Sequence, residues 1–156
     1  MNQINISQHE APMIITLSIQ LVSGMYAEAD WGCELEIEES SSLHDLHDAI
    51  QQAVAFDNDH MYSFFISRKE FGSERIHFDG EEFSLDDHIA SLFPLPKGKK
   101  LFYWFDFGDD WIFQVSKSRK KPREPQPDRQ YPFVAAETGS KPEQYKGYDP
   151  EAEDEW

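Results

Sequence analysis

Hydrophobic residues dominate the stretch Leu101–Val115, which reads LFYWFDFGDDWIFQV. Two apolar runs are separated there by Gly108 and Asp109, and such a pair between strand-like runs is typical of a tight β-hairpin because glycine adopts positive φ at little cost. We expect Phe107 to pair with Asp110. This register places six side chains on one face of the hairpin, namely Phe102, Trp104, Asp106, Trp111, Phe113 and Val115. An Asp among aromatic side chains needs a hydrogen-bond partner to offset its burial.

Two further segments alternate between apolar and polar residues, which predicts strands over residues 14–22 and 31–37, and residues 61–67 are rich in Phe, Tyr and Ile, which indicates a third strand. Between the last two, apolar residues recur at helical spacing from residue 43 to about residue 56. Ser42 precedes this helix and suits its N-terminal cap, with Asp45 in the first turn.

Four other segments show weaker patterns. A short extra strand is expected within residues 68–83, and a second, shorter helix is expected to start at Ser84 and to end before Pro94. Residues 118–132 contain four prolines and are expected to form a loop. Residues 131–148 keep several aromatic side chains and are expected to pack back on the core.

The order hairpin, helix, strand, short helix, hairpin predicts an α+β fold, in which a β-grasp-like mixed sheet packs on one main helix. A chain of 156 residues suits one domain. We expect this domain to span residues 13–148, after a flexible lead-in over residues 1–12. Residues 149–156 contain five acids and are expected to form a disordered tail.

Charge is distributed unevenly along the chain. The formal net charge is −16, and residues 1–96 hold 18 acidic but only 3 basic residues. Such an acidic chain repels phosphate backbones, so we expect a protein partner rather than a nucleic acid. One basic run departs from this pattern, with the side chains Lys117, Arg119, Lys120, Lys121 and Arg123. It is either a solvated loop or a contact site for nucleic acid or an acidic partner.

Cys33 is the single cysteine, so the chain forms no internal disulfide, and no Cys/His spacing typical of structural zinc occurs. Cys33 lies in a predicted strand and is expected to be a small core residue. The first apolar segment follows no Lys or Arg and is too short to cross a bilayer. We therefore expect a cytoplasmic protein without a membrane contact.

Asp106, Asp109 and Asp110 surround the predicted hairpin turn. Carboxylates gathered on a rigid turn can hold Mg²⁺ or Mn²⁺, which prefer oxygen ligands. Alternatively, Asp106 caps amides of the turn while the other two are solvated.

His44 and His47 lie one helical turn apart, and His60 follows the helix. A hydrogen-bonded structural role for His47 and His60 competes here with a metal site. The candidate polar cluster is therefore His47, His60, Asp106, Asp109, Asp110 and Trp111. We predict no cofactor, with a divalent metal as the alternative.

Four short elements occur along the chain in a characteristic order, namely residues 46–51 (LHDAIQ), residues 57–60 (DNDH), residues 103–111 (YWFDFGDDW) and Tyr131-Pro132. In this order they resemble the plasmid pRi ORF-three-like family, which is also labelled a transposon TnpR-like passenger family. The resemblance extends over about residues 14–148. It implies a compact α+β domain of no settled activity, sometimes associated with mobile elements.

The chain departs from the family pattern at two places. The family usually has a His two residues after the Trp, where this chain has Phe113. It also tends to have a Cys-Pro-Pro-Glu-Asp-like element near the end, where residues 140–145 contain no cysteine. A metal or catalytic site built on those groups would be incomplete here.

The sequence contains no P-loop, dinucleotide fingerprint or Ser nucleophile motif. It favours a non-enzymatic binding or adaptor domain, which acts through an exposed sheet edge or an aromatic patch near the hairpin. One alternative is a small divalent-metal-dependent hydrolase or nuclease that uses the Asp and His cluster. Another is a mobile-element accessory protein with weak nucleic-acid contact through the basic run. Nothing in the sequence indicates an oligomeric state.

Overall fold

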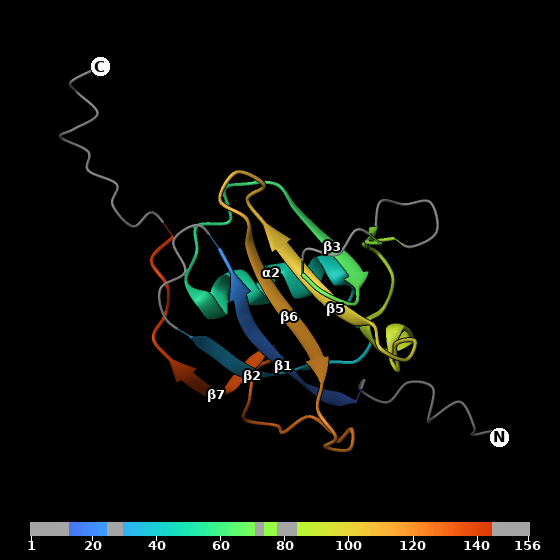
Figure 1. Cartoon of the computed structure of the whole chain (residues 1–156). Coiled ribbons are helices and arrows are strands. Elements are labelled where there is room, and N and C mark those ends of the chain that lie inside the picture. The colour runs from blue at the N-terminus through green and yellow to red at the C-terminus, as the bar shows by residue number, and fades with distance from the viewer. Residues whose placement is uncertain (1–12, 25–29, 71–73, 78–83, 145–156) are drawn as a thin grey trace.

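One antiparallel sheet forms the body of the protein (Figure 1). The computed structural model describes residues 13–24, 30–70, 74–77 and 84–144. The strands of this part are β1 (Ile14–Ser23), β2 (Trp31–Glu38), β3 (Tyr62–Ser67), β4 (Ile76–His77), β5 (Lys100–Phe105), β6 (Trp111–Lys117) and β7 (Phe133–Gly139). Their order across the sheet is β4-β3-β5-β6-β1-β2-β7. The helix α2 (Leu43–Val54) lies behind the sheet in Figure 1.

The helix α2 forms where the sequence predicts it. The Ser42 side chain accepts a hydrogen bond from the Asp45 amide, and the Asp45 side chain accepts one from the Ser42 amide, which completes a capping box. The helix ends at Ala55, whose φ of 63° is left-handed. No helix among the described residues is long and apolar enough to cross a membrane.

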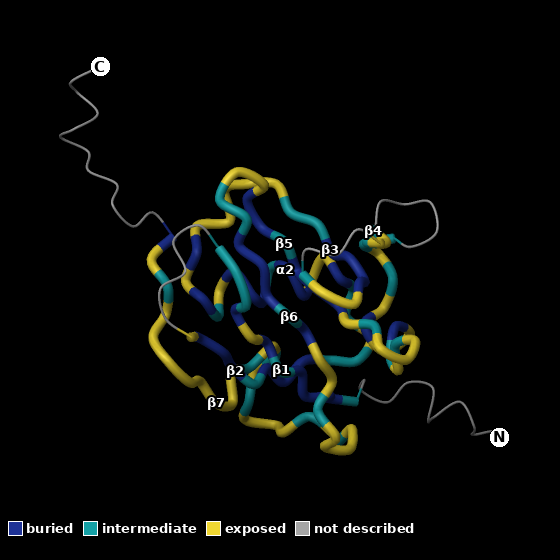
Figure 2. Tube along the Cα trace, viewed as in Figure 1, coloured by how far each residue is buried: buried dark blue, intermediate teal, exposed yellow. Residues whose placement is uncertain are grey.

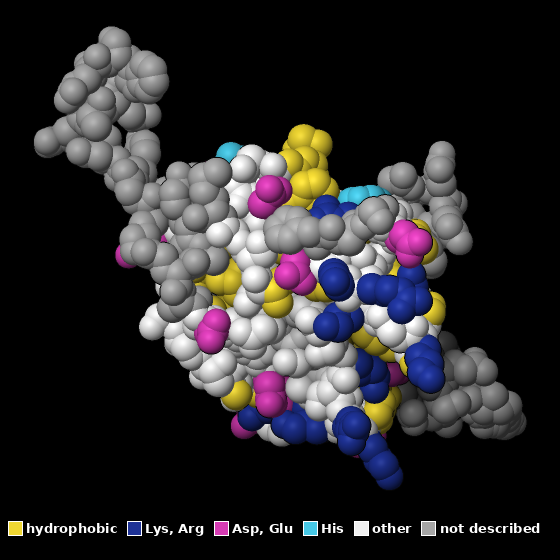
Figure 3. Space-filling model, in the orientation of Figure 1, with side chains coloured by type: hydrophobic (Ala, Val, Ile, Leu, Met, Phe, Trp, Pro, Cys, Tyr) yellow, Lys and Arg dark blue, Asp and Glu magenta, His cyan; other side chains and the backbone are white. Residues whose placement is uncertain are grey.

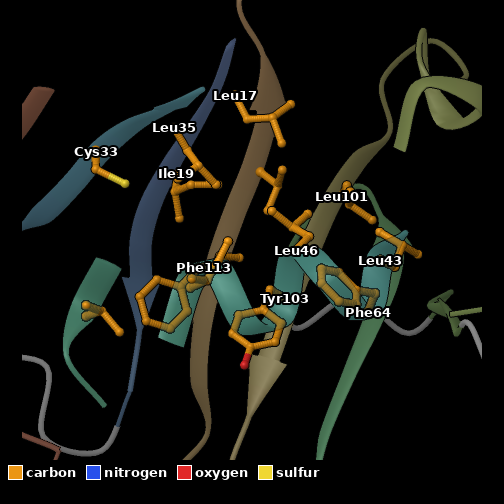
Figure 4. Close-up of a cluster of buried hydrophobic side chains, with 14 of the residues drawn as sticks. Leu17, Ile19, Cys33, Leu35, Leu43, Leu46, Phe64, Leu101, Tyr103 and Phe113 are labelled. Carbon is orange, nitrogen blue, oxygen red and sulfur yellow. The ribbon is translucent and has the colours of Figure 1, made fainter. Parts of the chain in front are cut away.

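The main core lies between α2 and one face of the sheet. Leu43, Leu46 and Ile50 of the helix are fully buried, and they join strand residues such as Leu17 and Tyr103 in one cluster (Figure 4). Full burial of each such aliphatic side chain stabilises the fold by about 2 kcal/mol. Cys33 also belongs to this cluster, as the sequence predicts.

A second, smaller cluster covers the opposite face of the sheet. Phe65, Phe102 and Ile112 are buried there, with Trp104 packed against them. The guanidinium of Arg75 lies 4.1 Å from the ring centroid of Phe65 and 5.1 Å from that of Trp104. The strands β5 and β6 are therefore buried on both faces, whereas β7 is exposed at the sheet edge (Figure 2).

The predicted register of the closing hairpin is wrong. Phe105 pairs with Trp111, and Tyr103 pairs with Phe113, so that residues 106–110 form a five-residue turn. Because side chains alternate between the faces of a strand, this register places Phe102 and Trp104 on the face opposite Trp111, Phe113 and Val115.

The α+β class describes the fold, but the predicted mixed sheet is wrong because every strand pairing in the described part of the chain is antiparallel. The strand β7 was not predicted, because its residues are exposed from Val134 onwards and show no apolar alternation. Strand direction depends on which strands become neighbours, and local sequence does not contain that information.

The predicted second helix is mostly absent. Only the 3₁₀-helix η1 (Ile89–Leu92) forms, while Ser84 and Asp87 close a turn in which the Ser84 amide donates to Asp87 Oδ2. The Ile89 amide donates to the Ser41 carbonyl, which ties this segment to the start of α2 instead of to a helix of its own. The predicted short extra strand is β4. The lead-in of residues 1–12 and the tail of residues 149–156 lie outside the described residues.

The proline-rich loop packs over the outer face of β1 and β2 around Glu36, which is only 7% exposed. Arg123 Nη2 lies 2.6 Å from Glu36 Oε2, and Arg129 Nη1 lies 2.9 Å from Glu36 Oε1. Arg123 also exchanges two backbone hydrogen bonds with Ile14 and donates to Thr16 Oγ1. Arg123, which belongs to the basic run, and Arg129, which follows it, thus hold the loop in place.

We expect Glu36→Gln to lower the free energy of unfolding by about 2 kcal/mol, because both arginines would lose their charged acceptor. The matched control is Glu34→Gln on the same strand. Its carboxylate forms only an exposed pair with Lys120, so its loss should cost less than about 0.5 kcal/mol. Urea denaturation of the two variants measures the difference, and equal losses would contradict the assigned role of Glu36.

Candidate functional site

Two loops meet at one end of the sheet, at the top of Figure 1. They are residues 56–61, between α2 and β3, and residues 106–110, the turn between β5 and β6. The Asp106 amide donates to the Met61 carbonyl at 2.9 Å, which joins the two loops directly. These residues are called the tip below, and two of the six predicted cluster residues, His47 and Trp111, lie outside them.

 Within the tip itself, the predicted cluster is represented by four side chains, namely His60, Asp106, Asp109 and Asp110.

Asp106 closes the turn. Its backbone has a left-handed φ of 62°, a conformation that Asp tolerates better than most residues. Its Oδ1 accepts hydrogen bonds from the amides of Gly108 at 3.1 Å and Asp109 at 3.2 Å. Its carbonyl accepts a further one from the Asp110 amide at 2.7 Å. The buried carboxylate is thus occupied by the backbone of its own turn.

His60 and two more carboxylates surround Asp106. His60 Nε2 lies 3.4 Å from Asp106 Oδ2 and 3.6 Å from Asp59 Oδ1. Partial burial and the neighbouring negative charge of Asp106 raise the pKa of the Asp109 carboxyl. The tip therefore brings His60, Asp106 and Asp109 together, with Asp59 at the side.

His47 belongs to a separate, buried network behind the tip. His47 Nδ1 lies 2.6 Å from the Tyr103 hydroxyl, and His47 Nε2 lies 2.8 Å from Asn58 Oδ1. Gln51 Nε2 donates to the same Tyr103 hydroxyl, and the Asn58 amide donates to Gln51 Oε1. The imidazole also stacks on the ring of Tyr62, with centroids 3.6 Å apart.

The donors and acceptors of this network assign the state of the imidazole. Asn58 Oδ1 can only accept, so His47 Nε2 carries a proton, and in the neutral ring Nδ1 then accepts the proton of the Tyr103 hydroxyl, which itself accepts from Gln51. Burial lowers the pKa of His47, which favours the same neutral form. Both ring nitrogens are occupied, so His47 supports the fold and is not directed at a ligand.

Asp110 and Trp111 point away from the other cluster residues. Asp110 Oδ1 accepts a hydrogen bond from Trp104 Nε1 at 2.8 Å, on the outer side of the hairpin. Trp111 is fully buried in the main core, and its indole nitrogen has no hydrogen-bond partner among the described residues. In that part of the chain no group of three or more His, Cys, Asp or Glu side chains is arranged to hold a metal ion.

The sequence analysis missed several residues that shape the tip. Gln144 accepts from the Asp57 amide at 2.6 Å and donates to Asp59 Oδ1 at 2.9 Å, across more than eighty residues of sequence. No local pattern indicates such a contact. Met61 and Phe107 are also missed, because the sequence predicts Met61 at the start of a strand and Phe107 in an apolar run, whereas the structure exposes both in loops.

The basic run lies at the other end of the sheet from the tip, because it follows the last residues of β6. Lys120 Nζ lies 3.0 Å from Glu34 Oε1, and Arg123 pairs with Glu36. Lys117, Arg119 and Lys121 form no salt bridge within the described residues. Two of the five charges of the run are therefore neutralised by the sheet.

We expect Tyr103→Phe to lower the free energy of unfolding by about 2 kcal/mol, because it leaves a buried acceptor on His47 and a buried donor on Gln51 unpaired. Tyr62→Phe is the control. Its hydroxyl contacts only the exposed His44, so the loss should stay within about 0.5 kcal/mol. Urea denaturation compares the variants, and a larger loss for Tyr62→Phe would contradict the network.

Because burial depresses the pKa of His47, the unfolded chain binds more protons than the folded chain once the pH falls below about 6.5. The free energy of unfolding should then decrease, by up to about 1.4 kcal/mol per pH unit from this residue. Nitrogen NMR of the side chain tests the cause directly. At pH 6.5, His47 should be mostly neutral with its proton on Nε2, whereas a half-protonated ring would contradict the assignment.

Comparison with solved structures supports the fold. A protein of unknown function from Methanosarcina mazei Go1, MM3350, is similar with a TM-score of 0.63 and 22% sequence identity, over 81% of this chain and 71% of that chain. No curated protein matches the sequence. Residues 17–150 match the family described as "Plasmid pRiA4b ORF-3-like protein", which confirms the resemblance inferred from the short elements. The chain belongs to the plasmid pRiA4b ORF-3-like family.

Proposed function

We propose that the protein is a non-enzymatic binding module that docks a basic segment of a partner protein against the tip. The observation that carries this proposal is the exposure of two large apolar side chains on either side of Asp106. Met61 is 72% exposed and Phe107 is 40% exposed. Large apolar side chains exposed on adjoining loops are typical of protein interaction sites.

The backbone segments that carry the two side chains are held in position before any partner binds. The hydrogen bond between the Asp106 amide and the Met61 carbonyl fixes the loop that carries Met61 next to the turn that carries Phe107. The ring of Phe107 rests against Trp104, with centroids 4.3 Å apart. Such preorganisation lowers the entropy that is lost on binding.

The charge of the tip favours a basic partner. The two loops of the tip contain five carboxylates, namely Asp57, Asp59, Asp106, Asp109 and Asp110. No Lys or Arg occurs in residues 1–67 or in residues 101–116, which supply the tip and the strands that lead to it. Complementary charge accelerates encounter and disfavours acidic partners, including nucleic acids.

The polar groups of the tip are used to hold it together, which supports binding over hydrolysis. The carboxylate of Asp106 accepts turn amides, Asp110 accepts from Trp104, and His47 has both nitrogens occupied. A metal-dependent hydrolase would need these side chains to converge on one point. Burial also raises the pKa of Cys33 to about 12, so its thiol is a poor nucleophile.

A pull-down from native lysate treated with nuclease tests the proposal. The test variant is Met61→Ser/Phe107→Ser, which removes the apolar pair. The matched control is Ile76→Ser/Val134→Ser, which removes the other two exposed large hydrophobic residues of the described chain, on β4 and β7. We expect the original protein and the control to retain a partner protein that the tip variant loses. The segment of this partner that cross-links to the tip should be rich in Lys and Arg.

Retention of the same proteins by the tip variant would contradict a docking role for Met61 and Phe107. Recovery of a partner only without nuclease would favour the accessory role with weak nucleic-acid contact. Circular dichroism of both variants verifies that neither result comes from unfolding.

A further inference from the structure

A groove lies at the end of the sheet opposite the tip. It is formed by residues 93–100, which lead into β5, and by residues 114–118 at the end of β6, and it encloses about 490 Å³. Because β5 runs towards the tip and β6 runs away from it, the first residue of β5 and the last residue of β6 meet at this opposite end. This region is called the lysine groove below.

Four lysines line the groove, namely Lys97, Lys99, Lys100 and Lys117. Within the described residues none of them forms a salt bridge, whereas Lys120, Arg123, Arg129 and Lys141 each pair with a carboxylate. Lys and Arg side chains cluster at the lower right of Figure 3, around the same end of the sheet. Cations that lie together repel one another, so an anion bound among them would be stabilised.

The lining between the lysines is apolar. Phe93 and Leu95 are partly buried and pack against the main core, and Val115 is fully buried at the base of the groove. The groove also exposes Pro94 and Pro96 along its rim. It therefore offers a place for an apolar side chain between positive charges.

We propose that the lysine groove binds a short acidic segment of a partner protein, with one apolar side chain of that segment seated between Phe93 and Leu95. Charge complementarity carries the choice of occupant. The chain has a net charge of −16, so a long polyanion such as nucleic acid is repelled wherever it extends beyond the groove. A short acidic segment is attracted by the groove and ends before that repulsion becomes large.

This second site is independent of the tip. The two surfaces lie at opposite ends of the strands β5 and β6 and have opposite charge. A module with both surfaces connects two partners, one basic and one acidic, across one rigid sheet.

Fluorescence anisotropy of the full chain tests the proposal with a fluorescein-labelled pentapeptide of four glutamates around one tryptophan. We expect saturable binding that weakens about tenfold in Lys99→Gln/Lys117→Gln. The control Lys120→Gln/Lys141→Gln removes the same charge from two lysines that already have partners, and it should bind within about twofold of the original protein. Lys99→Arg/Lys117→Arg keeps the charge and should restore binding.

Equal affinity of the groove variant and the control variant would overturn the proposal. So would preferential binding of a labelled oligothymidylate with the same number of charges, because that result assigns the groove to nucleic acid. Concentration-dependent self-association in analytical ultracentrifugation that the groove variant abolishes would assign it to a second copy instead. The tip variant Met61→Ser/Phe107→Ser should bind the acidic peptide normally, so that failure of one site is distinguished from failure of the other.

Discussion

The hydrogen bonds of Asp106 fix the register on which the other features depend. Its left-handed backbone and its bonds to Gly108, Asp109 and Asp110 close a five-residue turn, so Phe105 pairs with Trp111. A slip of one residue would exchange the two faces of a strand, moving the Tyr103 hydroxyl away from His47 and exposing the main core to polar side chains. The same turn holds Met61 and Phe107 at the tip through the Asp106 amide. One buried carboxylate thus links the core, the histidine network and the proposed docking surface.

The parts of the fold that depend on local signals could be predicted from the sequence. The capping box of Ser42 and Asp45 and the apolar spacing after it locate α2. The alternation in residues 14–22 locates β1, and the richness of residues 61–67 in Phe, Tyr and Ile locates β3. The hairpin register was not predicted, because the Gly-Asp pair favours a two-residue turn, whereas the left-handed backbone of Asp106 and its bonds to the turn amides form a longer one. The exposed β7 has no apolar pattern, and the bond between His47 and Tyr103 joins residues 56 positions apart.

The candidate site, like the fold, could be predicted from the sequence only in part. Sequence identified the polar residues of the turn but not their partners, so His60, Asp106 and Asp109 come together while Asp110 and Trp111 do not. These polar groups position the tip, and the surface that remains open there is apolar and acidic. At the other end of the sheet, four lysines that form no salt bridge with any described residue line an apolar groove. The two proposed contact surfaces therefore lie at opposite ends of one sheet.

Amide chemical shifts of the isotope-labelled full chain test directly whether the tip and the lysine groove bind different peptides independently. One titration uses a pentapeptide of four lysines around a tryptophan, and the other uses its glutamate counterpart. The account predicts that the lysine peptide shifts Met61 and Phe107, that the glutamate peptide shifts Lys99 and Lys117, and that neither peptide alters the affinity of the other. Shifts of the same residues by both peptides, or no saturable shifts at either end, would contradict it.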